Sequence, residues 1–255
     1  MSWVELLLVA LAGAAAGLIN TVVGSGTLIT FPTLLALGVP PVTANVSNTI
    51  GLTPGSVSGA LATRRELGGQ RTRLVRLGTA SLLGGVAGAL LLLRLPASAF
   101  DAIVPVLIGI GCVLVVVQPW LARRLAARRD RLGVTTFRPH GSAGLWFGVL
   151  LTGVYGGYFG AAQGVLLIGV LGIGLAESLQ RINAIKNVLA GLVNGIAGVL
   201  FVFLYQVNWW AAGAVAVGSV LGAQVGGRVG RRLPPLVYRV VIVVVGVTAI
   251  VNLLR

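Results

Sequence analysis

Residues 17–49 read GLINTVVGSGTLITFPTLLALGVPPVTANVSNT, and this stretch decides the fold class. An apolar run meets a glycine cluster at 24–26, a short apolar piece follows, and a second run bears small polar residues. Glycine lets a backbone leave helical geometry at little steric cost. The stretch therefore predicts a helix that breaks at the glycines, restarts as a short helix, and leads into a helix with a polar face.

The whole chain is too apolar for a water-soluble fold. Its 255 residues are 56% hydrophobic and 9% charged, with a mean hydropathy of +0.99, whereas a soluble domain carries about 25% charged residues. We expect an all-α polytopic protein of the cell membrane (plasma or inner membrane), in which each span takes about 20 residues. The expected spans are 3–23, 45–63, 74–95, 103–121, 142–159, 183–205, 209–227 and 235–254. The shorter pieces 27–37 and 163–175 are expected to be broken or tilted crossings.

The order of segments occurs twice. GVYGGYFGAAQG at 153–164 again ends in a glycine cluster, a short apolar piece follows, and NAIKNVLAGLVNGIAG at 183–198 is the second polar helix. The sequence thus divides into a first transmembrane repeat (1–121), a basic cytoplasmic linker (122–141) and a second transmembrane repeat (142–255).

The arginines indicate how the two repeats are oriented. Residues 64–76 are rich in arginine, while the equivalent loop 204–210 is uncharged, and the next pair of loops reverses this. Because basic loops stay in the cytoplasm, equivalent loops lie on opposite faces. This pattern predicts inverted-topology repeats, with broken or short helices at the glycine-rich breaks and both termini outside the cell.

Several function classes are disfavoured. The net charge of +14 comes mostly from the stretches 64–76, 123–138 and 228–239, which lie between apolar segments, so we expect them to set topology and touch anionic membrane lipid rather than nucleic acid. The single cysteine permits no internal disulfide, and the five acids all lie in loops or at segment ends. Without an intramembrane carboxylate pair or metal-ligand cluster, neither a cofactor, a metal nor enzyme activity is expected.

The two glycine breaks are the first candidate for a binding site. A helix that restarts after a break presents free N–H groups and the positive end of its dipole, which together attract anions. The expected contributors are Gly24, Ser25, Gly26 and Thr27 in the first repeat, and Gly160, Gln163 and Gly164 in the second. The alternative is that these small residues only allow close helix packing, as is common in membranes.

The second candidate is the polar face of each following helix. Lys186 is the sole lysine, and it lies inside an apolar run, where an ionisable group is costly and is a functional candidate by default. Asn183 and Asn187 share its helix, and Asn45, Ser47 and Asn48 occupy the matching helix of the first repeat. The alternative is that Lys186 lies near a helix end and extends to the membrane surface.

At these residues the sequence resembles the TauE/SafE family of sulfite exporters. The resemblance rests on residues 17–49 and on a weaker second copy at 144–198, and it covers nearly the whole chain. It implies export of a small sulfur-containing anion, such as sulfite or an organosulfonate, which we expect to bind near the membrane midplane between the repeats. A channel or uptake permease for another small solute and a non-transporting membrane scaffold remain as alternatives, and the chain is compatible with a homo-oligomer.

Overall fold

The computed structural model describes residues 1–132, 141–229 and 235–253, and every regular element within them is helical. The expectation of an all-α fold is confirmed. The elements are α1 (Trp3–Val22), α2 (Thr27–Ala36), α3 (Pro41–Ala62), the 3-10 turn η1 (Arg64–Leu67), α4 (Arg71–Arg94), α5 (Ala97–Leu132), α6 (Ala143–Tyr158), α7 (Gln163–Gly174), α8 (Leu179–Leu204), α9 (Trp209–Val229) and α10 (Pro235–Leu253).

Among the described residues, five helices are long and apolar enough to cross a membrane: Trp3–Val22, Arg71–Arg94, Ala97–Arg128, Leu179–Leu204 and Trp209–Arg228. The chain is therefore a multi-pass membrane protein. Three further expected spans fall outside this group, among them 235–254, whose described apolar part Arg239–Leu253 is shorter than a full span. Helix α3 has 22 residues but many of them are small and polar, and α6 has only 16 residues.

Local signals explain where the polar helices begin. Helix α3 begins at Pro41 rather than at residue 45, because the fixed φ of proline suits the first turn of a helix. Helix α8 begins at Leu179 rather than at residue 183, because the Ser178 Oγ atom accepts a hydrogen bond of 3.4 Å from the Arg181 N–H group and caps the helix. Helix α5 continues past residue 121 through an Ala/Arg/Leu-rich run to Leu132. Residues 133–140 of the expected linker lie outside the described residues.

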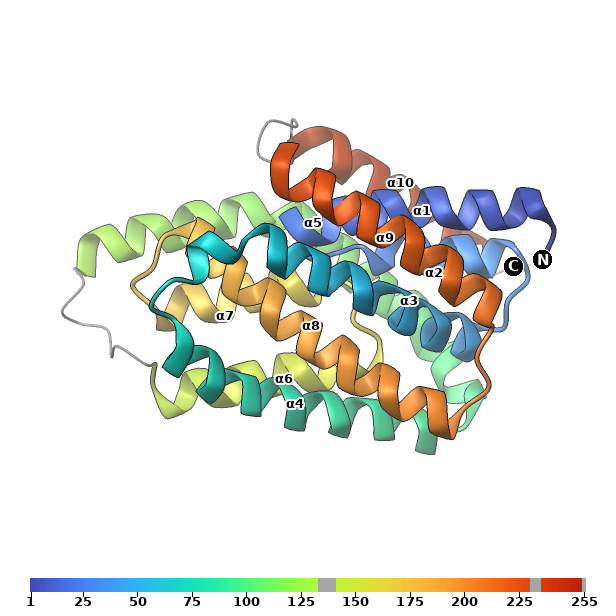
Figure 1. Ribbon diagram of the computed structural model, residues 1–255, viewed down its shortest axis with the longest axis horizontal. Coiled ribbons are helices and arrows are strands. Elements are labelled where there is room, and N and C mark those ends of the chain that lie inside the picture. Colours follow the sequence, from blue (N-terminus) through green and yellow to red (C-terminus); the bar gives the residue numbers. More distant parts are fainter. Residues whose placement is uncertain (133–140, 230–234, 254–255) are drawn as a thin grey trace.

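Corresponding helices of the two halves run in opposite directions. In Figure 1, α1 runs from right to left and α6 from left to right, and the same reversal holds for α3 and α8. Contacts cross between the halves, since α1 packs on α9 as α6 packs on α4, and α2 packs on α10 as α7 packs on α5. This arrangement supports the inverted-topology interpretation, although orientation in a bilayer stays a prediction.

Two of the arginine-rich segments, 64–76 and the described part of 123–138, lie at one end of the molecule (Figure 1). The α3–α4 junction, the end of α5 and the starts of α6 and α8 all lie at the left of Figure 1, opposite the chain termini. We call this the basic end. By the positive-inside rule we expect it to be the cytoplasmic end.

Glycines let the paired helices touch at their backbones. A Cβ atom on Gly222 of α9 would lie 1.8 Å from the carbonyl oxygen of Ala14 in α1, and one on Gly88 of α4 would lie 2.1 Å from that of Val154 in α6. These glycines therefore serve close packing of the kind common between membrane helices. The packing alternative holds for them, whereas Gly24 and Gly160 lie just beyond the ends of α1 and α6.

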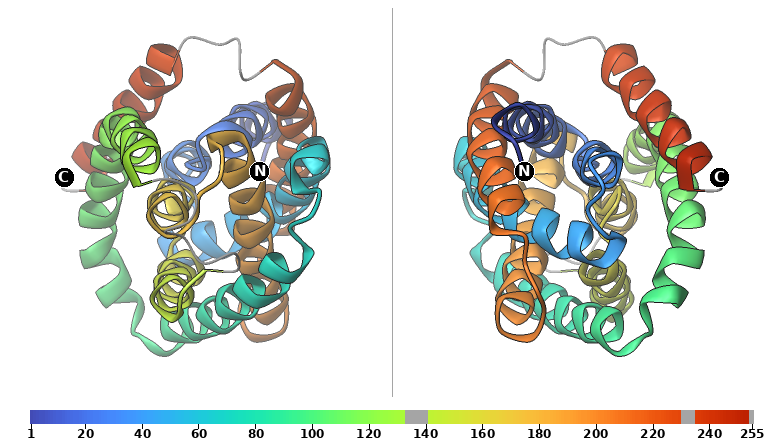
Figure 2. Two further views of the ribbon diagram at one scale, coloured as in Figure 1. Left: turned by 90° about the vertical axis from the view of Figure 1, so that its left-hand side faces the viewer. Right: turned by 90° about the vertical axis from the view of Figure 1, so that its right-hand side faces the viewer.

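The short helices α2 and α7 lie toward the centre of the bundle in both end-on views, while α5 and α10 lie side by side at its edge (Figure 2). Phe31 of α2 stacks edge-on against Phe159 at 5.1 Å, and Phe100 of α5 contacts Phe159 at 6.0 Å. This aromatic contact holds the end of α6 against the first half. Both breaks are thereby placed in the interior.

Candidate functional site

The two glycine breaks have the same geometry. Gly24, just beyond α1, has φ +89° and its N–H group donates to the Ile19 carbonyl at 3.1 Å. Gly160, just beyond α6, has φ +77° and its N–H group donates to the Tyr155 carbonyl at 3.1 Å. Left-handed backbone at the end of a helix is where glycine is favoured. The breaks are therefore matched helix endings.

The breaks also meet each other in space. The N–H group of Gly164 donates to the carbonyl oxygen of Gly24 at 3.0 Å, and a Cβ atom on Gly24 would lie 2.4 Å from the Cα atom of Gly164. The structure therefore brings these two expected site residues into contact. It also engages one of the N–H groups expected to face an anion.

Lys186 lies in the interior and does not extend to the surface. Its side chain is 1% exposed, and its Nζ atom donates to the carbonyl oxygens of Asn20 at 2.9 Å and Thr21 at 3.4 Å. These carbonyls belong to the last turn of α1, the negative end of that helix dipole. The ammonium group thus caps the broken helix of the other half.

Two asparagines of α8 contact the same helix end. Asn183 Nδ2 and Asn187 Nδ2 donate to the Thr21 carbonyl at 3.0 and 3.4 Å, and Asn187 Nδ2 also lies 3.4 Å from the Thr63 hydroxyl at the end of α3. The three residues expected on α8 therefore converge on the end of α1.

The first half makes the reciprocal contact: a side chain of its polar helix α3 caps the end of α6 in the second half. Asn45 Nδ2 of α3 donates to the carbonyl oxygen of Tyr158, the last residue of α6, at 2.9 Å. Asn48 contacts α2 instead, where its amide oxygen accepts from Thr30 and its amide nitrogen lies 3.4 Å from the Thr27 hydroxyl. Ser47 points elsewhere, since its hydroxyl accepts from the Asn208 N–H group at 2.9 Å before α9. The structure thus separates Ser47 from the other site candidates.

The remaining break residues carry buried polar atoms. Gly26 is the N-cap residue of α2. Ser25 and Gln163 are 1% and 3% exposed, and neither the Ser25 hydroxyl nor the Gln163 amide nitrogen has a hydrogen-bond partner among the described residues. Buried polar atoms without a partner are rare in folded proteins and invite a ligand or water.

A small cavity lies beside the meeting point of the breaks. Its volume is about 10 Å³, which accommodates about one water molecule. It is lined by Asn20, Thr21, Gly24, Gly55, Ser56, Gly59, Lys186, Asn187 and Ala190. Sequence reasoning missed Asn20, Thr21 and Ser56, although Asn20 and Thr21 are polar residues just before the first glycine cluster. We call this conformation closed.

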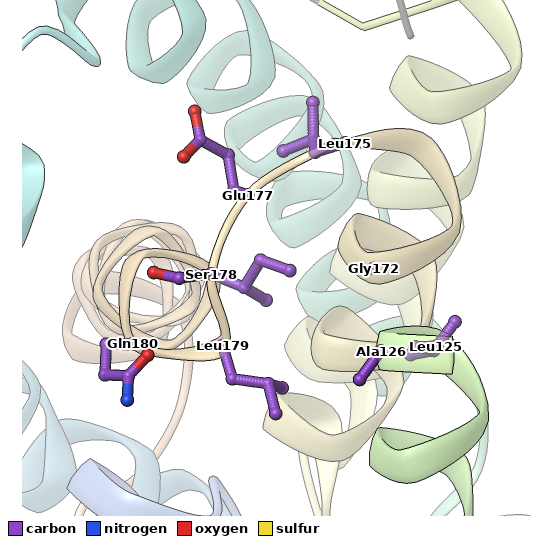
Figure 3. Close-up of a pocket in the computed structure, with 9 residues that line it drawn as sticks. Leu125, Ala126, Gly172, Leu175, Glu177, Ser178, Leu179 and Gln180 are labelled. Carbon is purple, nitrogen blue, oxygen red and sulfur yellow. The ribbon is translucent and has the colours of Figure 1, made fainter. Parts of the chain in front are cut away.

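A larger hollow at the basic end is less suited to an anion. It measures about 230 Å³ and lies between α5, α7 and the start of α8 (Figure 3). Its described lining is mostly apolar, and the one charged side chain in it is the acid Glu177. In Figure 3 the Glu177 carboxylate points away from Leu125 and Ala126. The cavity beside Lys186 is therefore the better candidate.

Substitution of Asn45 with leucine tests the reciprocal capping. The variant keeps the side-chain shape but removes the hydrogen bond to the Tyr158 carbonyl, so we expect the protein to lose about 1–3 kcal/mol of stability. Thermal unfolding in detergent measures this loss. Asn252→Leu on the exposed end of α10 is the control, and equal melting temperatures for Asn45→Leu and wild type would contradict the capping role.

These features define a class of protein, namely a multi-pass membrane protein with two matched broken helices and a buried lysine side chain beside the point where they meet. The sequence model of the family described as "Sulfite exporter TauE/SafE" matches residues 9–253, and the chain belongs to this family. The resemblance found in the sequence is thereby confirmed.

Relatives carry transporter names. The chain is 27% identical over 253 residues to the "Probable membrane transporter protein YfcA" of Escherichia coli (strain K12), with 94% of this chain and 86% of that protein covered. It is also 27% identical over 219 residues to a "Probable membrane transporter protein" of Haemophilus influenzae, with 85% and 81% covered. The family is thus one of membrane transporters and not a class of enzymes.

Proposed function

We propose that this protein is a non-enzymatic transporter that exports a small sulfur-containing anion, such as sulfite or an organosulfonate, across the cytoplasmic membrane. The observation that carries the proposal is the buried ammonium group of Lys186 beside the contact between the two glycine breaks. An ionisable group at this depth is expensive and marks a transport pathway more often than a packing role.

The ammonium group of Lys186 can exchange its present hydrogen-bond acceptors for an anion. In the closed conformation its ammonium group is held by the neutral carbonyls of Asn20 and Thr21. A sulfite or sulfonate oxygen carries negative charge and is the stronger acceptor. Asn187 and Ser56 line the same cavity. Their donors, now bonded to Thr21, Thr63 and Leu52, would exchange partners in the same way. The anion would therefore bind as Lys186 leaves the end of α1.

The cavity must widen for this binding. Its volume of about 10 Å³ is smaller than a sulfur oxyanion, so access requires the halves to move apart on one side of the site. Rocking of one repeat against the other about a central site is how inverted-repeat transporters alternate access. Lys186 at the junction of the two halves would couple anion binding to this motion.

The membrane potential favours export. A monoanion that leaves a cell held negative inside gains about 2.3 kcal/mol per 100 mV. Export consequently needs no coupled ion. Uptake of the same anion would need one, and the two acids on candidate spans, Glu5 and Asp101, lie near the starts of their helices rather than deep in the membrane, where a proton relay would need them.

Efflux from proteoliposomes tests the proposed function. Vesicles that contain the purified protein and are loaded with sulfite should release it along an imposed potential, with a rate that saturates as sulfite concentration rises. Competition by sulfate, thiosulfate and taurine identifies the preferred anion. A rate that rises linearly would indicate a channel, and release equal to that of protein-free vesicles would reject transport of these anions.

A further inference from the structure

We propose that Arg73 and Arg181 form an anion-binding access site at the basic end, and that the Glu177 carboxylate occupies this site in the closed conformation. The site would admit small oxyanions from the cytoplasm, and Glu177 would act as the gate that keeps them out. This inference rests on the proposed function for the identity and direction of the anion, whereas the gate itself does not depend on it.

The carboxylate bridges two guanidinium groups from different parts of the chain. Glu177 Oε1 lies 2.8 Å from Arg73 Nη1 of α4, and Glu177 Oε2 lies 3.1 Å from Arg181 Nη1 of α8. The Glu177 and Arg73 side chains are 15% and 12% exposed, and that of Arg181 is 38% exposed. Each carboxylate oxygen thus has its own cationic partner in a partly dehydrated setting.

The same groups tie the two halves together. Arg181 Nη2 donates to the Gly68 carbonyl at 2.6 Å, and Arg73 also contacts the Gln70 side chain. Gly68, Gln70 and Arg73 belong to the first half, while Glu177 and Arg181 belong to the loop and helix that follow α7. The ion pairs therefore link the start of α4 in the first half to the loop before α8 and its first turn in the second half, two helices that also pack on each other.

The bridge lies on the basic-end side of the cavity. Arg181 precedes Lys186 by five positions on α8, a rise of about 7–8 Å at about 1.5 Å per residue. Between them, Asn183 contacts the Thr21 carbonyl, and beyond Lys186 Asn187 contacts Thr63. A solute that moved from the basic end along α8 would therefore pass the level of the Glu177 bridge before it reached Lys186.

A carboxylate is a chemical analogue of the proposed cargo. Carboxylate, sulfite and sulfonate each present negatively charged oxygens that a guanidinium fork binds through paired hydrogen bonds. A cytoplasmic oxyanion could therefore replace Glu177 between the two arginines and loosen the link between the halves. Cations have no such route, because the two guanidinium groups repel them.

The charge state of Glu177 suits a gate that works at neutral pH. Burial by itself would raise the pKa of the Glu177 carboxyl, but the hydrogen bonds from Arg73 and Gln70 and the charges of Arg181 and Arg73 hold it below its ordinary value of 4.5. The ion pairs are therefore complete above that value and are lost only as the pH falls through the lowered pKa.

Cysteine accessibility tests the gate without any substrate. Ala190 lines the cavity, so Ala190→Cys in a Cys112→Ala background reports access to it from a membrane-impermeant thiol reagent on the cytoplasmic face of inside-out vesicles. Glu177→Gln keeps the shape but removes the charge, and we expect it to raise the labelling rate about tenfold or more, as loss of charge-assisted hydrogen bonds implies. Asp101→Asn, which removes one carboxylate charge at an exposed position near the start of α5, is the control and should not raise the rate.

Transport measurements then test the anion site. Arg73→Gln and Arg181→Gln should each raise the cytoplasmic sulfite concentration at half-maximal efflux, while Arg65→Gln should not.

Unchanged labelling in both Glu177→Gln and Arg181→Gln would overturn the gate. Faster labelling with unaltered concentration dependence in both arginine variants would overturn the anion site. Faster labelling without flux of any anion would leave the gate standing and reject the proposed function instead.

Discussion

Replacing Lys186 with methionine should lower sulfite efflux about a hundredfold or more, because truncation of one partner of a buried charge contact costs about 2–5 kcal/mol. Methionine has a similar length and no charge, so it fills the same space beside Gly164. The Thr21 carbonyl keeps its hydrogen bonds from Asn183 and Asn187. We therefore expect the variant to insert and fold with only part of the capping lost.

Two comparisons separate the charge of Lys186 from its structural role. Size-exclusion and thermal unfolding in detergent should show a folded Lys186→Met protein that melts somewhat below wild type. Arg65→Gln, which removes an exposed positive charge at the basic end, should transport normally. Full efflux by Lys186→Met would show that the ammonium group only caps α1 and would remove the observation on which the proposed function depends.

Replacing Gly24 with alanine should prevent the two halves from assembling. The new Cβ atom would lie 2.4 Å from the Cα atom of Gly164, and the φ of +89° at Gly24 is one that L side chains rarely adopt. Neither backbone can withdraw without breaking the hydrogen bond between Gly164 N–H and the Gly24 carbonyl. We expect little monodisperse protein after extraction from membranes.

Two other glycines serve as controls for the Gly24 variant. A methyl group added at Gly213 within α9 would have nothing within 4 Å, so Gly213→Ala should leave folding unchanged. Gly38 has φ +78° but also has open space around it, so Gly38→Ala isolates backbone strain of about 1–2 kcal/mol. A Gly24→Ala protein as stable as Gly38→Ala would mean that the contact with Gly164 tolerates a methyl group.

Much of the helical framework is predictable from the sequence. The short helices at 27–36 and 163–174 follow from glycine clusters that flank apolar runs too short to cross a bilayer. The spacing of Lys186, Asn183 and Asn187 predicts that they share a helix face, and they converge on one helix end as such spacing implies.

Other features depend on contacts that residue types do not reveal. The acceptors for Lys186 are backbone carbonyls of Asn20 and Thr21, and every residue has a carbonyl, so only the break in α1 makes these two available. Ser47 has the same polar character as its neighbours on α3, yet it faces α9. Its direction follows from how α3 packs between α8 and α9, which local sequence does not encode.

The exchange of caps between the halves has a consequence for biosynthesis. The ribosome adds about 5–20 residues per second, so α1 enters the membrane on the order of ten seconds before α8 is made. During that interval the carbonyls of Asn20 and Thr21 lack the donors that Lys186 and Asn183 later supply. An unsatisfied carbonyl in hydrocarbon costs several kcal/mol. The nascent chain must therefore keep the end of α1 in contact with water or the insertion machinery until its second half arrives.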